Sequence, residues 1–229
     1  MVFPFKGMEL MFIGFVAGFV HVISGPDHMA ALAPFVTRRG KIESWRLGYN
    51  WGLGHATGIS MIGLLIWQLK DTTAANWVSN GAEWLVGLLL VTFGALGIRS
   101  IHKHNIHTHE HDHYGIRHSH IHMHNSKVQS SASHHHSHAS LGIGLLHGTA
   151  GGTHLWVVLP TLAIVSFSGL VLYLASYTLA TVATMALFSA ALGKLKKRLT
   201  TNSPRLGQGF GFVCCAASML VGSYWLLAI

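Results

Sequence analysis

Apolar residues fill long intervals of this chain, and charged residues stand between them in short groups. No Asp, Glu, Lys or Arg occurs between Arg46 and Lys70, between Lys127 and Lys194, or after Arg205. A helix that crosses a bilayer needs about 20 mostly apolar residues. The charge-free intervals therefore predict membrane-spanning helices.

We predict six spans from these intervals and from the turn residues between them. They cover residues 9–36, 45–69, 80–98, 141–166, 169–193 and 206–227. The first span is interrupted at Gly25-Pro26, because proline removes a backbone donor and clashes with the preceding turn. The fourth is interrupted near Gly151-Gly152. The expected fold is an all-α polytopic membrane protein with six transmembrane helices.

Composition supports this fold class. Charged residues make up 10% of the chain, whereas about 25% is usual in soluble domains. The net charge of +8 does not indicate nucleic-acid binding, because the basic residues lie in short loops between apolar intervals. Cys214 and Cys215 are adjacent in an apolar interval, so we expect packing residues and not a disulfide framework. Several tryptophans lie near predicted span ends, as an aromatic belt would: Trp45, Trp67, Trp77, Trp84 and Trp225.

Basic residues are distributed unequally between the two sides of the predicted membrane. The loops after the first, third and fifth spans hold 13 of the 15 Lys and Arg residues, and the other side holds Lys6 and Lys70. Cytoplasmic loops carry the excess of basic residues in membrane proteins. We therefore expect a multi-pass protein of the plasma or bacterial inner membrane with both termini outside. The N-terminal apolar interval is expected to stay as the first span, not to be removed as a signal peptide.

An internal repeat with an offset of 126 residues organises the chain. The matched pairs are Gly18 and Gly144, His21 and His147, Gly25 and Gly151, His28 and His154, and Pro34 and Pro160. We predict two three-helix repeats, residues 1–98 and 141–229, joined by a loop of residues 99–140. Because three spans is an odd number, the second repeat must be inverted. Inverted repeats with interrupted helices are typical of secondary transporters with a site near the bilayer midplane.

The first interruption places a carboxylate, Asp27, between two imidazoles, His21 and His28. A carboxylate at the centre of a membrane costs about 3 kcal/mol on insertion scales. Asp27 either caps the second half-helix, or it holds a cation or orients a ligating imidazole. The flanking imidazoles favour the second interpretation.

The histidines of each repeat are seven residues apart, which is about 10 Å along an unbroken helix. Either the interruptions shorten this distance, or each histidine serves a successive position on a path. His55 follows close-packing glycines, Gly54 and Gly58, and is a further ligand or an outer group. The predicted metal ligands are His21, Asp27, His28, His55, His147 and His154. The secondary candidates are Met29, Asn50, Thr149 and Thr153.

Imidazole suits Ni²⁺, Co²⁺, Zn²⁺ and Cu²⁺, whereas Mg²⁺ and Ca²⁺ prefer oxygen. The donor set therefore predicts a late first-row divalent metal. The loop of residues 99–140 contains 14 of the 19 histidines. Histidine-rich tracts bind metals, so we interpret this loop as a cytoplasmic metal buffer or sensor and expect it to be disordered.

The segments around these histidines resemble a known family. The interval from His21 through Asp27 and His28 to Pro34 resembles the first signature of the UreH-like branch of nickel/cobalt transporters. The spacing is His-x5-Asp-His, whereas the nickel/cobalt permeases proper have His-x4-Asp-His. The intervals Trp51 to Gly58 and Gly144 to His154 are also similar to this branch. The histidine-rich loop is more similar to that of nickel/cobalt efflux proteins. The resemblance implies a polytopic permease for Ni²⁺ or Co²⁺, with some members tied to urease supply.

We therefore predict a secondary transporter that imports Ni²⁺ or Co²⁺. Export of the same metals is the alternative, and an intramembrane metal sensor or zinc enzyme is a third hypothesis. The sequence contains no Gly-x4-Gly-Lys-Ser/Thr loop for ATP, and no His-Glu-x-x-His motif lies on any predicted span, so we expect no catalytic activity. We expect no prosthetic group. The expected partners are the transported ion, the lipid bilayer and a cytoplasmic metallochaperone, with no nucleic acid.

Overall fold

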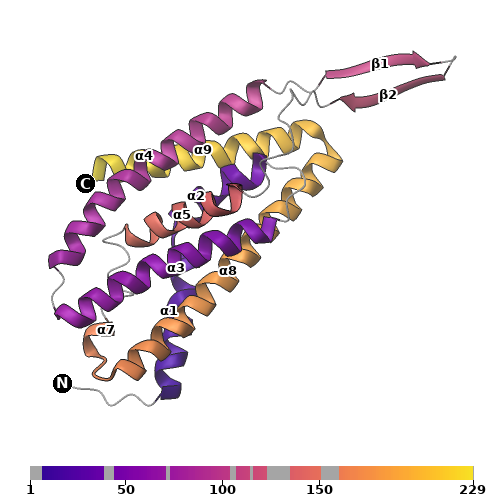
Figure 1. The fold of residues 1–229 in the computed structure, drawn as a ribbon. Helices are drawn as coiled ribbons and strands as arrows, with labels where there is room; N and C mark the ends of the chain where they lie inside the picture. Colours follow the sequence, from indigo (N-terminus) through magenta and orange to yellow (C-terminus); the bar gives the residue numbers. More distant parts are fainter. Residues whose placement is uncertain are drawn as a thin grey trace.

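The chain folds into a bundle of long helices (Figure 1), in a computed structural model that describes residues 7–38, 44–70, 73–103, 107–113, 116–122, 135–150 and 160–228. The elements are α1 (Gly7–Ser24), α2 (Pro26–Arg38), α3 (Ser44–Leu69), α4 (Thr73–Lys103), β1 (His107–His113), β2 (Ile116–His122), α5 (His135–Thr149), α7 (Pro160–Ala163), α8 (Phe167–Asn202) and α9 (Pro204–Ala228). Five described helices are long and apolar enough to cross a membrane, namely α1, α3, α4, α8 and α9. The prediction of a helical, multi-pass membrane protein is confirmed at this level.

The predicted spans agree with the helices except at their ends. The second and sixth spans match α3 and α9 closely, whereas α4 and α8 extend beyond the predicted third and fifth spans. Where we predicted the fourth span, the structure has α5 and the four-residue α7. Residues 151–159 between them lie outside the described residues, and with them the predicted interruption and the predicted ligand His154.

The interruption of the first span is confirmed. Helix α1 ends at Ser24, Gly25 stands outside both helices, and α2 begins at Pro26. Proline is favourable as the first residue of a helix, because its missing N–H group would have no partner there and its fixed φ suits the helix. Pro26 thus ends one helix and starts the next.

The most extensive helix packing is between the two halves of the chain. Helix α1 packs on α8, α5 on α3, α3 on α8 and α4 on α9. The contacts are close because glycines face backbone: a Cβ at Gly18 would overlap the carbonyl oxygen of Tyr177, and one at Gly144 would overlap that of Trp51. Small residues at helix crossings are typical of membrane bundles.

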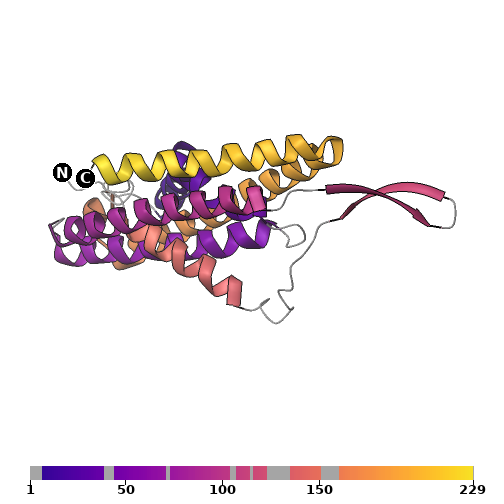
Figure 2. The ribbon, with the colours of Figure 1, turned by 90° about the horizontal axis from the view of Figure 1, so that it is seen from above.

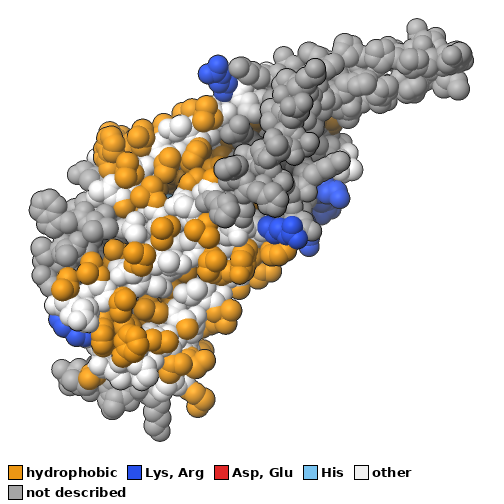
Figure 3. All heavy atoms as spheres, in the orientation of Figure 1, with side chains coloured by type: hydrophobic (Ala, Val, Ile, Leu, Met, Phe, Trp, Pro, Cys, Tyr) orange, Lys and Arg blue, Asp and Glu red, His pale blue; other side chains and the backbone are white. Residues whose placement is uncertain are grey.

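The largest buried cluster lies between α2, α3, α4 and α8, around Leu32, Trp51, Val86 and Met185. Large apolar side chains also cover the outside of the bundle (Figure 3). Leu187, Leu220 and Leu227 are among the exposed ones. Lys and Arg side chains in the same view lie near the two ends of the bundle. This distribution suits a bundle surrounded by lipid, because a bilayer removes the apolar surface from water.

The strands β1 and β2 form an antiparallel ribbon that extends beyond one end of the bundle (Figure 2). The register pairs His107 with His122, His109 with His120, and His111 with His118. The expectation of disorder for residues 99–140 is wrong for the part that the structure describes. Helix α4 continues to Lys103, and residues 107–113 and 116–122 form paired strands. In both strands histidine alternates with other residues, which matches the two-residue period of a strand.

Candidate metal centre

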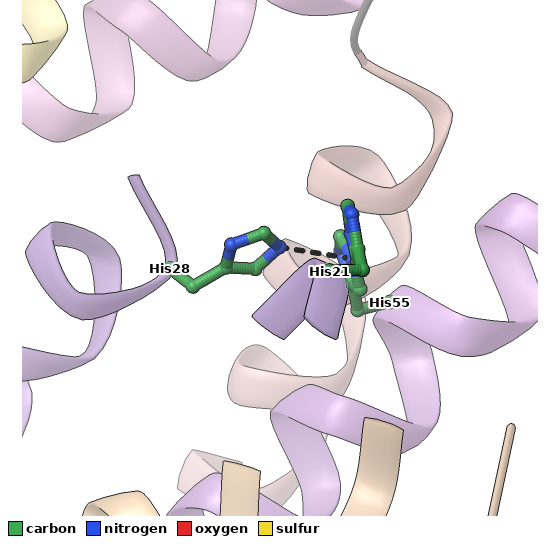
Figure 4. A group of neighbouring side chains, drawn as sticks. All are labelled: His21, His28 and His55. Atoms are coloured by element: carbon green, nitrogen blue, oxygen red, sulfur yellow. Dashed lines mark hydrogen bonds between the residues drawn. The ribbon is translucent and has the colours of Figure 1, made fainter. Parts of the chain in front are cut away.

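Three imidazoles converge at the interruption of the first span. His21 lies in the last turn of α1, His28 in the first turn of α2, and His55 near the middle of α3 (Figure 4). Nε2 of His55 is 3.1 Å from Nε2 of His21 and 3.2 Å from Nε2 of His28. All three side chains are buried, with exposed fractions of 3% or less.

The interruption explains how His21 and His28 meet. An unbroken helix would keep residues seven apart about 10 Å from each other. In the structure the centroids of the two rings are 4.6 Å apart. The chain turns at Gly25, so the start of α2 folds His28 back towards the end of α1. The interruption therefore shortens the distance between His21 and His28, so that the two histidines lie in one site and not at successive positions on a path.

A second cluster shares His28 with the first. One carboxylate oxygen of Asp27, Oδ2, is 2.9 Å from Nε2 of His147 in α5, and the other, Oδ1, is 3.3 Å from Nδ1 of His28. Asp27 and His147 are also buried, at 5% and 1% exposed. Both groups, His21/His28/His55 and Asp27/His28/His147, have their ligand atoms within 4.8 Å of one another.

The surroundings of His28 determine which of its nitrogens carries hydrogen. Its Nδ1 is 3.2 Å from the carbonyl oxygen of Gly25 and 3.3 Å from Oδ1 of Asp27. Both neighbours are acceptors, so Nδ1 is the donor and Nε2 holds the lone pair. A carboxylate that accepts from one imidazole nitrogen while the other faces a metal is the usual arrangement at histidine metal sites. Asp27 therefore orients the His28 lone pair towards His21 and His55.

The arrangement of the three Nε2 atoms favours binding of a shared cation over hydrogen bonds among the rings. Because His28 Nε2 is an acceptor, one hydrogen on His55 Nε2 would have to serve both neighbouring rings. Two nitrogens bound to one tetrahedral ion with bonds of about 2.0–2.1 Å lie about 3.3–3.4 Å apart. The distances of 3.1 and 3.2 Å are close to this value. The cluster can hold a divalent metal with only small side-chain movements.

Glycine at position 25 is required by these side chains. A Cβ at Gly25 would overlap the imidazole of His28 and lie 2.7 Å from Oδ1 of Asp27. Both side chains fold back over the start of α2 and occupy the space that any larger residue would need. The glycine therefore places the ligands as well as permitting the turn.

Trp51 is a site residue that sequence reasoning missed. Its ring stacks on His55, with centroids 4.9 Å apart and planes 13° apart, and it contacts His28 at 5.8 Å and His147 at 5.0 Å. It is 1% exposed. The available signal was spacing, because a residue four positions before His55 lies on the same face of a helix. Trp51 fixes the rings of both clusters in place.

A cavity of about 430 Å³ reaches this centre from the side of α9. It is lined at the interruption by His21, Ser24, Gly25, Pro26, Asp27 and His28, and on α9 by Leu220, Val221, Tyr224 and Trp225. The ring of Trp225 also stacks on His147, with centroids 5.6 Å apart. Trp225 is therefore a wall of the site, in addition to its predicted position near a span end.

The structure brings together five of the six predicted ligands: His21, Asp27, His28, His55 and His147. The sixth, His154, lies outside the described residues, as does the secondary candidate Thr153. Among the other secondary candidates, Met29 is 40% exposed, and the Thr149 hydroxyl donates to the carbonyl of Leu146 in its own helix. Cys214 and Cys215 are buried in α9 as thiols and do not form a disulfide.

Comparison with known proteins identifies the family. Over 222 residues the chain is 31% identical to the urease accessory protein UreH of Bacillus sp. (strain TB-90), and the alignment covers 96% of this chain and 91% of UreH. The chain belongs to the UreH-like branch of the nickel/cobalt transporter family. The resemblance predicted from the intervals around His21, His55 and His147 is therefore confirmed.

Two plant proteins are also similar to this UreH-like chain. The chloroplast proteins FOR GROWTH AND FERTILITY 1 and 2 of Arabidopsis thaliana are 31% and 30% identical to it over 91% and 84% of its length. The chain spans about half of each plant protein, 56% and 49% respectively. No family model and no solved structure matches the chain.

Proposed function

We propose that this chain is a secondary transporter that imports Ni²⁺ or Co²⁺ through the buried His/Asp centre. The observation that carries the proposal is the convergence of Nε2 of His21, His28 and His55 at a helix interruption in the bundle. Three imidazoles supported by a carboxylate favour a late first-row divalent ion. Membership of the UreH-like branch supports nickel or cobalt among these ions.

The packing supports the inverted repeat that we propose for the mechanism. The offset of 126 residues relates Gly18 to Gly144 and Trp51 to Tyr177. Gly18 lies against the backbone of Tyr177, and Gly144 lies against the backbone of Trp51. The same operation turns the contact of His21 with Tyr177, at 6.0 Å, into that of His147 with Trp51, at 5.0 Å. The same offset relates the packing of α1 on α8 to the packing of α5 on α3. A rocking motion of two such halves would alternate access to a central site.

The two halves differ in the residues that face the centre. The repeat relates His55 to Thr181, which is buried in α8, so the second half lacks the third imidazole. It also relates Asp27 to Thr153. We infer that the ion lies closer to His21, His28 and His55 than to the ligands of the second half.

The cavity supports an entry route from outside the cell. Its α9 wall, Leu220 to Trp225, lies in the last third of a helix that ends at Ala228. The excess of basic loop residues after the first, third and fifth predicted spans assigns that side to the cytoplasm, and hence the end of α9 to the outside. In this orientation the cavity leads from the outer half of the membrane to His21 and His28.

The ribbon supports a metal buffer on the cytoplasmic side. The two strands contain seven histidines, and histidine-rich segments bind metals: His107, His109, His111, His113, His118, His120 and His122. We propose that these histidines collect ions leaving the central site and pass them to a cytoplasmic metallochaperone.

Transport by the purified protein in liposomes tests the proposal. We expect external Ni²⁺ or Co²⁺ to accumulate inside the vesicles, and the His55→Ala variant to lose this uptake. Cys214→Ala is the matched control, since Cys214 is buried in α9 and belongs to neither cluster. Cellular metal content gives the direction: import raises it, whereas export lowers it and confers metal tolerance. A sensor or enzyme would change neither, and this result would exclude transport.

A further inference from the structure

We propose that the ion occupies two overlapping positions in turn, and that His28 belongs to both. The first position lies among Nε2 of His21, His28 and His55. The second lies between Asp27 and His147, with Nδ1 of His28 as its third donor. The inference rests on the proposed function and adds how the ion passes from one half of the protein to the other.

The orientation of His28 is the main argument. Its Nε2 is directed at His55, 3.2 Å away, whereas its Nδ1 is directed at Asp27, 3.3 Å away. The two donor groups therefore lie on opposite edges of one ring. A neutral imidazole has a single ring lone pair and ligates through one nitrogen at a time. With the ion at Nε2, Nδ1 keeps the hydrogen that it donates to Gly25 and Asp27. For the ion to bind Nδ1, that proton must leave, and Nε2, no longer bound to the ion, must take up a proton. An ion at one position thus deprives the other position of its shared ligand, and the two positions fill alternately.

The donors of the two positions differ in charge. The first position offers three neutral nitrogens, with Asp27 acting only through His28. The second offers the Asp27 carboxylate directly, together with His147, whose Nε2 is 2.9 Å from Oδ2. A buried carboxylate compensates the charge of a divalent ion. We infer that the first position selects an ion that prefers nitrogen, and that the second holds it after its remaining water is lost.

The helices that supply the donors differ between the two positions. The first position uses α1, α2 and α3, all from the first half, whereas the second adds His147 of α5 from the second half. His21, Asp27 and His28 line the cavity, whereas His55 and His147 are not among its lining residues. The cavity therefore reaches donors of both positions, and movement of the ion from the first position to the second transfers it to a donor of the second half.

Crystals soaked in Ni²⁺ and measured for anomalous scattering test this inference, with His55→Ala and His147→Ala compared against the wild type. We expect His55→Ala to hold its ion beside Asp27 and His147. We expect His147→Ala to keep its ion among the three Nε2 atoms and to bind Ni²⁺ with nearly unchanged affinity, while liposome uptake falls more than ~10-fold.

A conservative variant separates ligation from hydrogen bonding. His147→Gln keeps an N–H donor for Asp27 but offers no imidazole lone pair. If His147 only holds Asp27 in place, His147→Gln restores uptake and the second position does not exist. The inference would also be overturned if His147→Ala lost binding and uptake in parallel. It would be overturned as well if His55→Ala crystals held no ion while wild-type crystals held one. If the wild type neither bound nor transported Ni²⁺, the proposed function itself would be wrong.

Discussion

Oδ2 of Asp27 in α2 lies 2.9 Å from Nε2 of His147 in α5, although 120 residues separate them in the sequence. Both side chains are buried, and the other oxygen of Asp27 faces His28. A single carboxylate thus connects the interrupted helix of the first half to the first helix of the second half. Because breaking a buried pair leaves an uncompensated polar group, we expect this contact to couple metal binding to the relative position of the halves.

We expect Asp27→Asn to lower the affinity for Ni²⁺ by about 10- to 100-fold, because partners that orient a ligating histidine contribute this much. The amide oxygen still accepts from one imidazole, but the charge is lost. Isothermal titration calorimetry on the protein in lipid nanodiscs measures the change. Glu9→Gln is the control, because Glu9 is an exposed carboxylate in the first turn of α1. Equal affinities for Asp27→Asn and the wild type would show that Asp27 does not orient His28.

Gly25→Ala is expected to abolish Ni²⁺ binding while leaving the helices intact. The added Cβ would overlap the His28 imidazole, so His28 must turn away from His55. Binding is measured by calorimetry, and helix content by circular dichroism. Gly209→Ala is the matched control, since no heavy atom lies within 4 Å of a Cβ at that glycine of α9. If Gly25→Ala binds Ni²⁺ as the control does, the geometry around His28 is not needed for the site.

The sequence predicted the interruption, the histidines on both sides of it and the family, because these depend on local residue chemistry and on spacing. It left His55 undecided, since only the packing of α3 against α1 and α2 places that ring between His21 and His28. Spacing alone could have placed Trp51 beside His55, but its contacts with His28 and His147 could not be predicted, because those residues come from two other helices. The ribbon was missed because histidine-rich composition was given more weight than the alternation of residues in β1 and β2.

The proposed inverted repeat predicts matched effects at matched glycines. Gly18→Ala and Gly144→Ala each place a methyl group against a backbone carbonyl, that of Tyr177 or that of Trp51. We expect both variants to lower the midpoint of thermal unfolding by similar amounts, measured by fluorescence in detergent. Gly142→Ala serves as the control, because no heavy atom lies within 4 Å of a Cβ there. A large loss for one variant and none for the other would argue against equivalent crossings.

The last prediction concerns the histidines of the ribbon. We expect replacement of His109, His111, His118 and His120 by alanine to reduce the Ni²⁺ bound per chain, because the register pairs His109 with His120 and His111 with His118, and histidine-rich segments bind metals. Equilibrium dialysis measures the bound metal. The control replaces three other residues of the same strands, Thr108, Glu110 and Ser119. Uptake at saturating Ni²⁺ should stay unchanged in both variants, because the central site lies in the bundle. If the histidine variant lost uptake at saturating metal, the ribbon would belong to the transport path and would not be a buffer.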